Sequence, residues 1–180
     1  MSTDKSVSTG SDKSVSYIET ERLVIKPISI DDAPFIFDLL TSESWIKNIG
    51  NRGLKTIEDA RKIIQERYIK HNQTEGLGVF TARLKTENQA IGMCTLMQKP
   101  YLDNVDIGYA FLDKFNGNGY ALEATKAVYN YAKTDLGLTR IVAATLESND
   151  RSQNLLGKLG FYFEKKIVTE GEELMIFADV

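Results

Sequence analysis

The chain has 180 residues, with 22 basic and 25 acidic side chains, a formal net charge of -3, one cysteine and one histidine. One cysteine excludes an internal disulfide and a cysteine-rich zinc site, and one histidine excludes a histidine-rich cluster, so we predict no metal. The slight acidic excess argues against a nucleic-acid partner, whose binding surface is usually basic, and no stretch approaches the roughly 20 apolar residues of a membrane span.

Residues 1–16 differ in composition from the rest of the chain. They contain the sequence DKSVS twice and no aromatic residue. Such a segment buries too little apolar surface to offset the entropy lost on ordering, so we predict a disordered N-terminal tail. It also lacks the continuous apolar stretch of a signal peptide. We expect residues 17–180 to form a single domain located in the cytoplasm.

The hydrophobic pattern from Tyr17 onward alternates between the periods of strands and helices. Acidic residues and a proline open the first expected helix, and Thr56 followed three residues later by Asp59 resembles a helix cap. Residues 42–55 show no clear period. The expected elements, in chain order, are a strand at 21–26, helices at 31–40 and 56–68, strands at 77–84, 89–97 and 103–111, a helix at 118–136, a strand at 139–146, a helix at 150–159, and strands at 161–168 and 172–179.

Strands follow one another in the middle of the chain, whereas strand and helix alternate in its C-terminal half. Short polar links between consecutive strands favour an antiparallel meander, and a helix between two strands favours a parallel crossover. The pattern therefore predicts an α+β domain with a mixed, mostly antiparallel sheet of about seven strands flanked by about four helices.

The most informative segment is the turn Asn-Gly-Asn-Gly at residues 116–119, which joins an expected strand to a helix. Glycines without Cβ let backbone N–H groups approach an anion closely, and the helix N-terminus adds unpaired donors and its dipole. The segment therefore predicts a diphosphate cradle. The alternative is a plain connection, because Asn-Gly pairs commonly form tight turns. Neither of the two best-known phosphate-loop patterns is satisfied. No Lys-Ser/Thr pair follows the second glycine, and Leu122 stands where the third glycine of G-x-G-x-x-G would be.

This turn resembles the acetyl-CoA motif R/Q-x-x-G-x-G/A of the GNAT acetyltransferase superfamily, with Asn116, Gly119 and Ala121 at its three defining positions. Two further blocks lie in the same order as in that family. Residues 19–23 are similar to its T-x-R-L opening, and residues 149–161 are similar to the N-x-x-S…E-K-L-G-F signature of the branch that contains the ribosomal-protein N-acetyltransferases.

Two positions depart from the family pattern. Asn116 replaces an arginine, glutamine or tryptophan, and it has no guanidinium, so backbone donors must carry more of the phosphate binding. Asp113 stands where proline is common, and a carboxylate near a diphosphate is repelled unless it points away.

The resemblance implies a GNAT-like fold and direct transfer of an acetyl group from acetyl-CoA to a primary amine, either a protein N-terminus or a small molecule. A carboxylate would help to remove the amine's proton. Asp106 and Glu147 are the expected bases, with the alternative that they are solvated acids at strand ends. Many superfamily members use a tyrosine as the acid for the thiolate, but Leu156 occupies that position here, so Ser152 is the expected hydroxyl.

The resemblance also assigns the binding residues. A backbone N–H near Tyr109 or Phe111 would stabilise the developing oxyanion. Asn149 would contact the pantetheine amides, or alternatively cap a helix. The acceptor site would include Phe35 and Trp45. The residues expected to bind acetyl-CoA are Tyr109, Phe111, Asn116, Gly117, Asn118, Gly119, Tyr120, Ala121 and Asn149.

The remaining conspicuous residues fit structural roles. Cys94 lies in an apolar run and is expected in the core, and His71 is expected at the end of a helix. The expected partners are acetyl-CoA and an amine acceptor, without nucleic acid or membrane, and a homodimer is left open. A non-catalytic acyl-CoA-binding regulatory module is the alternative function, suggested by Leu156 and Asn116.

Overall fold

The computed structural model describes residues 17–72 and 77–180, so the predicted tail at 1–16 lies outside the described residues. The strands are β1 (Ile18–Glu19), β2 (Leu23–Pro27), β3 (Gly78–Leu84), β4 (Ala90–Met97), β5 (Val105–Phe111), β6 (Ile141–Thr145), β7 (Tyr162–Thr169) and β8 (Glu172–Ala178). The α-helices are α1 (Ala33–Leu40), α2 (Glu43–Asn48), α3 (Ile57–Ile63), α4 (Ile69–Asn72), α5 (Tyr120–Thr134) and α6 (Asp150–Lys158).

A π-helical segment, Ile64–Tyr68, joins α3 to α4 without a break, so the described part of the chain has eight strands and five helices. The strands form one sheet in the order β1-β2-β3-β4-β5-β6-β8-β7. Every neighbouring pair is antiparallel except β5 and β6, which are parallel. This confirms the predicted α+β class and the mostly antiparallel sheet.

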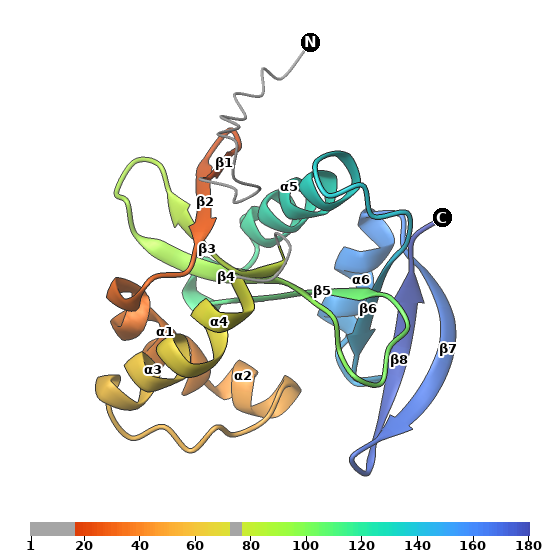
Figure 1. Cartoon of the computed structure of the whole chain (residues 1–180), viewed down its shortest axis with the longest axis horizontal. Coiled ribbons are helices and arrows are strands. Elements are labelled where there is room, and N and C mark those ends of the chain that lie inside the picture. Colours follow the sequence, from red (N-terminus) through yellow and green to blue (C-terminus); the bar gives the residue numbers. More distant parts are fainter. Residues whose placement is uncertain (1–16, 73–76) are drawn as a thin grey trace.

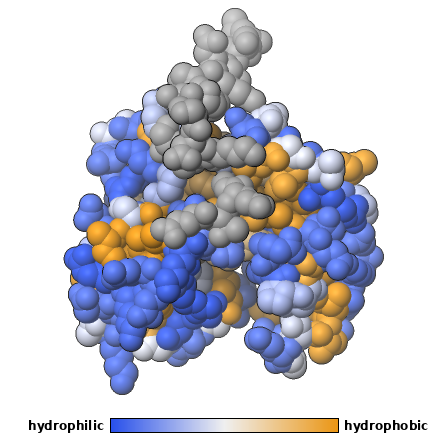
Figure 2. Space-filling model, in the orientation of Figure 1, coloured by the Kyte–Doolittle hydropathy of each residue, from blue (hydrophilic) through white to orange (hydrophobic). Residues whose placement is uncertain are grey.

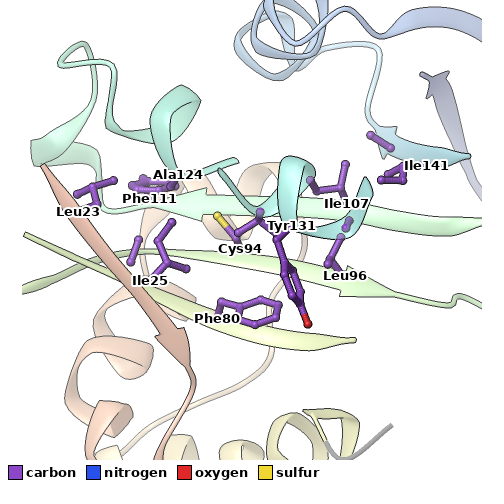
Figure 3. Packing of buried hydrophobic residues seen from close by; sticks show 14 of the residues in the cluster. Leu23, Ile25, Phe80, Cys94, Leu96, Ile107, Phe111, Ala124, Tyr131 and Ile141 are labelled. Carbon is purple, nitrogen blue, oxygen red and sulfur yellow. The ribbon is translucent and has the colours of Figure 1, made fainter. Parts of the chain in front are cut away.

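Helices cover both faces of the sheet and bury a separate hydrophobic cluster on each. Successive residues of β3 point to opposite faces of the sheet, so Phe80 packs under α5 whereas Val79 packs against α1 and α3. Figure 1 shows α1–α4 together on one side of the molecule and β7 with β8 on the other. Figure 3 shows Cys94 inside the cluster beneath α5, among Phe80, Ala124 and Tyr131.

Burial explains the chemistry of Cys94. The side chain is fully buried and reduced, and desolvation raises the pKa of its thiol to about 12. A neutral thiol in an apolar cluster is a packing group, which confirms the structural interpretation. His71 likewise lies in the last turn of α4, as expected.

The structure differs from the expected elements mainly between residues 41 and 55, where it has the short helix α2. Ser42 caps this helix, and its hydroxyl accepts a hydrogen bond of 3.3 Å from the backbone N–H of Trp45. A helix of six residues is too short to establish a clear hydrophobic period, and its cap and packing hold it instead. None of the described helices is long and apolar enough to cross a membrane.

Candidate active site

The sheet forks between β5 and β6. These two strands pair only through Val105 with Ile141 and Asp106 with Val142, after which they separate. The remainder of β5 is consequently less buried than its start, with Gly108 to Ala110 partly exposed. The fork opens at the carboxyl ends of both strands, where α5 begins and where the loop to α6 starts.

Asp106 stabilises the point at which the strands part. Its side chain accepts a hydrogen bond of 3.0 Å from the backbone N–H of Ala144, the fourth residue of β6. The other carboxylate oxygen lies 2.9 Å from Nζ of Lys99. Asp106 raises the pKa of Lys99 above its ordinary value, although burial opposes the charged form. Asp106 is 2% exposed and does not line the cavity described below, because one oxygen binds the backbone of β6 and the other binds Lys99 in the loop after β4.

Two backbone donors of β5 face the fork. The N–H of Leu112 donates 3.0 Å to the carbonyl oxygen of Ile91 on β4. Donors alternate between the two edges of a strand, so the N–H groups of Phe111 and Tyr109 point to the opposite edge, where β6 has separated. The phenyl ring of Phe111 lies over Gly92, where a Cβ would come within 2.2 Å of it.

The predicted glycine turn lies beside the fork and exposes a row of backbone donors. Gly117 and Gly119 have φ angles of 81° and 79°, the left-handed region that glycine adopts without a Cβ penalty. Within the described chain, the N–H groups from Gly117 to Leu122 have no hydrogen-bond partner, and the first intrahelical bond runs from Glu123 N–H to Gly119 O at 3.0 Å. These unpaired donors at the start of α5 fit an anionic group.

The fork and the glycine turn line one cavity of about 560 Å³. Part of α2, the end of β5, the glycine turn and residues along the length of α6 form its walls. Two cations of α6, Arg151 and Lys158, line it with a single acid, Asp113, and neither cation has an ion-pair partner in the described part of the chain. In Figure 2 a hollow separates the side formed by α1–α4 from the side that carries β7 and β8.

Two hydroxyl groups meet across the fork. Oη of Tyr109 on β5 lies 2.8 Å from Oγ of Ser152 on α6 and donates to the carbonyl oxygen of Ser152 at 3.1 Å. Burial raises the pKa of Tyr109 to about 12, so its phenol is neutral at physiological pH. Both side chains line the cavity. A neutral hydroxyl pair of this kind is able to donate a proton.

The structure places most of the expected binding residues in this cavity. Asn149 caps α6, and its side-chain oxygen accepts from the N–H of Ser152 at 3.1 Å, while its amide N–H₂ has no partner among the described residues and is able to donate to a ligand. Asn116 carries no charge, and its side-chain amide donates to the carboxylate of Asp113 at 3.0 Å. The expected binding residues that line the cavity are Tyr109, Phe111, Asn116, Gly117, Gly119, Tyr120, Ala121 and Asn149, and Asn118 does not.

The two expected acceptor residues lie in different places. Trp45 lines the cavity, and its buried Nε1 has no hydrogen-bond partner among residues 17–72 and 77–180. Phe35, on α1, packs inside the hydrophobic cluster formed with α3 and does not line the cavity. Glu147 is also outside it, because its exposed carboxylate pairs with Lys166 of β7 at 3.1 Å.

Sequence reasoning missed three features of this site. The contact of the Tyr109 hydroxyl with Ser152 joins residues 43 positions apart, and no local pattern announces it. The cations Arg151 and Lys158 were present in the matched block at 149–161, where their spacing along one helix was a usable signal. The third feature is Arg22, which binds the glycine turn from the start of the domain.

The comparison with known families now decides the assignment. The Acetyltransferase (GNAT) domain matches residues 22–162, a span that contains the fork, the glycine turn and α6. The chain belongs to the GNAT acetyltransferases. It is accordingly an acetyl-CoA-dependent acyltransferase.

Individual proteins agree with this assignment. The uncharacterized N-acetyltransferase YoaA of Bacillus subtilis (strain 168) is 31% identical over 149 residues, which cover 82% of this chain and 83% of that protein. A GNAT-family acetyltransferase from Bacillus anthracis has a TM-score of 0.75 at 25% identity, covering 90% of this chain and 96% of that one. RimL, a ribosomal L7/L12 alpha-N-protein acetyltransferase solved with coenzyme A, has a TM-score of 0.74 at 17% identity, covering 89% and 95%, and shares the fold.

Proposed function

We propose that this protein transfers an acetyl group directly from acetyl-CoA to a primary amine, with no acetylated enzyme intermediate. The observation that carries this proposal is the joining of three features in one cavity: the unpaired donors of the glycine turn, the open edge of β5 and the Tyr109–Ser152 hydroxyl pair. Acetyl-CoA supplies the thioester when it is bound. The amine nitrogen forms a bond to the carbonyl carbon, the carbon–sulfur bond breaks, and the amine's proton is lost as the sulfur gains one.

The walls of the cavity divide these tasks. The donors from Gly117 to Ala121 and the cations Arg151 and Lys158 would hold the phosphates, which offsets the chain's overall charge of -3. The N–H groups of Tyr109 and Phe111 would stabilise negative charge that develops on the carbonyl oxygen. A fixed donor of this kind is worth about 3 kcal/mol in a transition state.

The hydroxyl pair would protonate the departing sulfur. Ser152 Oγ is the group that we place next to the sulfur, and Tyr109 Oη orients it through their 2.8 Å contact. Leu156 fills the position where the family usually has a tyrosine, and it is buried in the core. The contact with Ser152 would let Tyr109 supply the tyrosine hydroxyl instead. The tyrosine would act from β5 instead of from α6.

The proton of the amine requires another route. Because neither Asp106 nor Glu147 lines the cavity, we propose that Asp113, its one acidic lining residue in the described chain, accepts that proton through water. Asp113 also lines a neighbouring cavity of about 400 Å³ with Glu43 and Asp150. The cations Lys47 and Arg151 lie among these acids, so the groove is mixed in charge and presents no continuous acidic surface to a polycation.

We therefore expect the acceptor to be a molecule with a single amine and a nearby oxygen atom of its own. The unpartnered Nε1 of Trp45 is a buried donor, and a buried donor without a partner costs about 1–3 kcal/mol. A carbonyl or hydroxyl oxygen of the acceptor would satisfy it. A peptide N-terminus carries a carbonyl oxygen near its amine, whereas a polyamine carries no oxygen, so we favour the peptide as acceptor. The cytoplasmic location and the homodimer stay predictions from the sequence.

Release of free thiol from acetyl-CoA tests this function. We expect release to depend on an added peptide with a free N-terminus and to stop when the same peptide is acetylated at that amine. Spermidine should be the poorer acceptor. Tight binding of CoA without turnover on any amine would instead support the non-catalytic acyl-CoA-binding module.

A further inference from the structure

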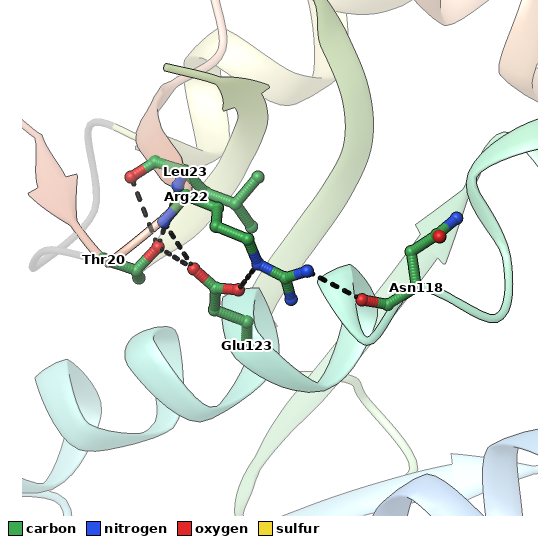
Figure 4. Close-up of polar contacts among 5 residues, drawn as sticks. All are labelled: Thr20, Arg22, Leu23, Asn118 and Glu123. Atoms are coloured by element: carbon green, nitrogen blue, oxygen red, sulfur yellow. Dashed lines mark hydrogen bonds and ion pairs between the residues drawn. The ribbon is translucent and has the colours of Figure 1, made fainter. Parts of the chain in front are cut away.

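The start of the domain is tied to the glycine turn by a group of polar contacts, drawn in Figure 4. Arg22, at the turn before β2, donates from Nε to Glu123 of α5 at 2.7 Å and from Nη1 to the carbonyl oxygen of Asn118 at 2.9 Å. Glu123 also accepts from the backbone N–H of Arg22 at 2.9 Å and from the hydroxyl of Thr20 at 2.6 Å. Both carboxylate oxygens of Glu123 and two of the three guanidinium nitrogens of Arg22 therefore have a defined partner.

The guanidinium is held in one orientation. It lies 4.4 Å from the ring centroid of Tyr120, the first residue of α5, while two of its nitrogens bind Glu123 and Asn118. A planar group with a stacked face and two fixed edges loses its freedom to turn. The hydrogen bonds from Thr20 and Arg22 lower the pKa of Glu123, although burial opposes this shift. The ion pair is consequently intact at neutral pH.

The bond to Asn118 fixes a peptide plane of the turn. The chain has no cis peptide bond in its described residues, and in a trans peptide the C=O and the following N–H point in opposite directions. Because Arg22 holds the carbonyl oxygen of Asn118, the N–H of Gly119 points away from Arg22. Gly119 lines the cavity, whereas Asn118 and Arg22 do not. The arginine therefore lies behind the turn, and the donor faces the cavity.

We propose that Arg22 is a positioning residue for the diphosphate cradle. It turns the N–H of Gly119 toward the bound diphosphate and keeps the negative end of the Asn118 carbonyl away from it. A cation on the carbonyl also strengthens the N–H of the same peptide as a donor. This role compensates for Asn116, which has no charge. The proposal rests on CoA binding at the glycine turn, and it adds a residue 96 positions away that shapes the turn from behind.

The substitution Arg22→Gln tests this role through binding. Calorimetry with CoA, and competition with pantetheine, which lacks the diphosphate, separate the cradle from the rest of the cavity. We expect Arg22→Gln to raise the Kd for CoA about tenfold, which is about 1.4 kcal/mol, and to change the Kd for pantetheine less than about twofold. Equal losses for both ligands, or no loss for CoA, would overturn the proposal.

Further variants separate position from charge. Arg22→Lys keeps the charge but not the planar fork, so we expect it to weaken CoA binding nearly as much as Arg22→Gln, and a wild-type Kd would overturn the proposal. It also serves if Arg22→Gln does not fold. Glu123→Gln, which frees Arg22, should weaken CoA binding, whereas tighter binding would mean that Arg22 acts as a direct phosphate cation.

The control is Arg140→Gln, which removes the same charge from an ion pair with Glu164 that is remote from the turn, and its Kd for CoA should stay within about twofold of wild type. Failure of the wild-type protein to bind CoA would reject the proposed function as well. If the wild type binds CoA and the Arg22 variants bind it equally well, only the positioning role fails.

Discussion

The substitution Tyr109→Phe removes one oxygen atom from the fork and leaves the aromatic ring. Its hydroxyl contacts only Ser152 among the described residues, at 2.8 Å to Oγ and 3.1 Å to the carbonyl oxygen. The ring packs against the main hydrophobic cluster and is unchanged by the substitution. The variant therefore isolates the chemical contribution of the hydroxyl from that of packing.

The expected effects on stability and turnover differ in size. A hydrogen bond contributes about 1 kcal/mol net, so unfolding should become easier by about 1–2 kcal/mol, a decrease in Tm of a few degrees. A positioned general acid contributes about 10²–10⁴-fold. Because Ser152 remains, we expect kcat to fall about 10- to 100-fold in a protein that is still folded at 25 °C.

The assay is thiol release with saturating acetyl-CoA and peptide, measured with the thermal unfolding of both proteins. The pH profile adds a second test. Burial raises the pKa of Tyr109 to about 12, so the neutral donor persists above the ordinary value of 10, and the wild-type kcat should show no decrease from this group up to about pH 11. Unchanged turnover in Tyr109→Phe would refute this role of the hydroxyl. A wild-type decrease near pH 10 that the variant lacks would keep the role and contradict the raised pKa.

Three other substitutions test separate parts of the site. Gly119→Val forces a β-branched residue to a φ of 79° with its Cβ 3.4 Å from Nη2 of Arg22, so CoA binding should be lost while circular dichroism shows an intact fold; normal binding would place the cradle elsewhere. Asp106→Asn leaves Lys99 without its partner, and unfolding should become easier by about 3 kcal/mol with little change in kcat; lower kcat at an unchanged Tm would instead give Asp106 a chemical role. Trp45→Phe should raise the KM for the peptide and not that for acetyl-CoA, and an unchanged peptide KM would remove Trp45 from the acceptor site.

Local sequence patterns were sufficient for much of the fold. The cap at Thr56 and Asp59 forms as predicted, with hydrogen bonds in both directions, and Asn149 caps α6. The three middle strands form the predicted antiparallel meander. These features depend on residues within a few positions of one another, where spacing and residue type decide the conformation.

The site required information that no local pattern holds. Asp106 has the position of a strand acid, but its burial depends on Lys99 and on Ala144, which belongs to another strand. The contacts of Tyr109 with Ser152 and of Arg22 with Asn118 form only after the sheet has brought distant segments together. A sequence motif therefore located the glycine turn, whereas the groups that act around it depend on tertiary packing.

A crystal structure of the protein with CoA bound would test the central claim most directly. We predict that the diphosphate accepts hydrogen bonds from the backbone N–H groups of the glycine turn and that the sulfur lies within hydrogen-bonding reach of Ser152 Oγ, at the open edge of β5. A sulfur atom outside the fork, or a diphosphate held away from residues 117–121, would contradict the account.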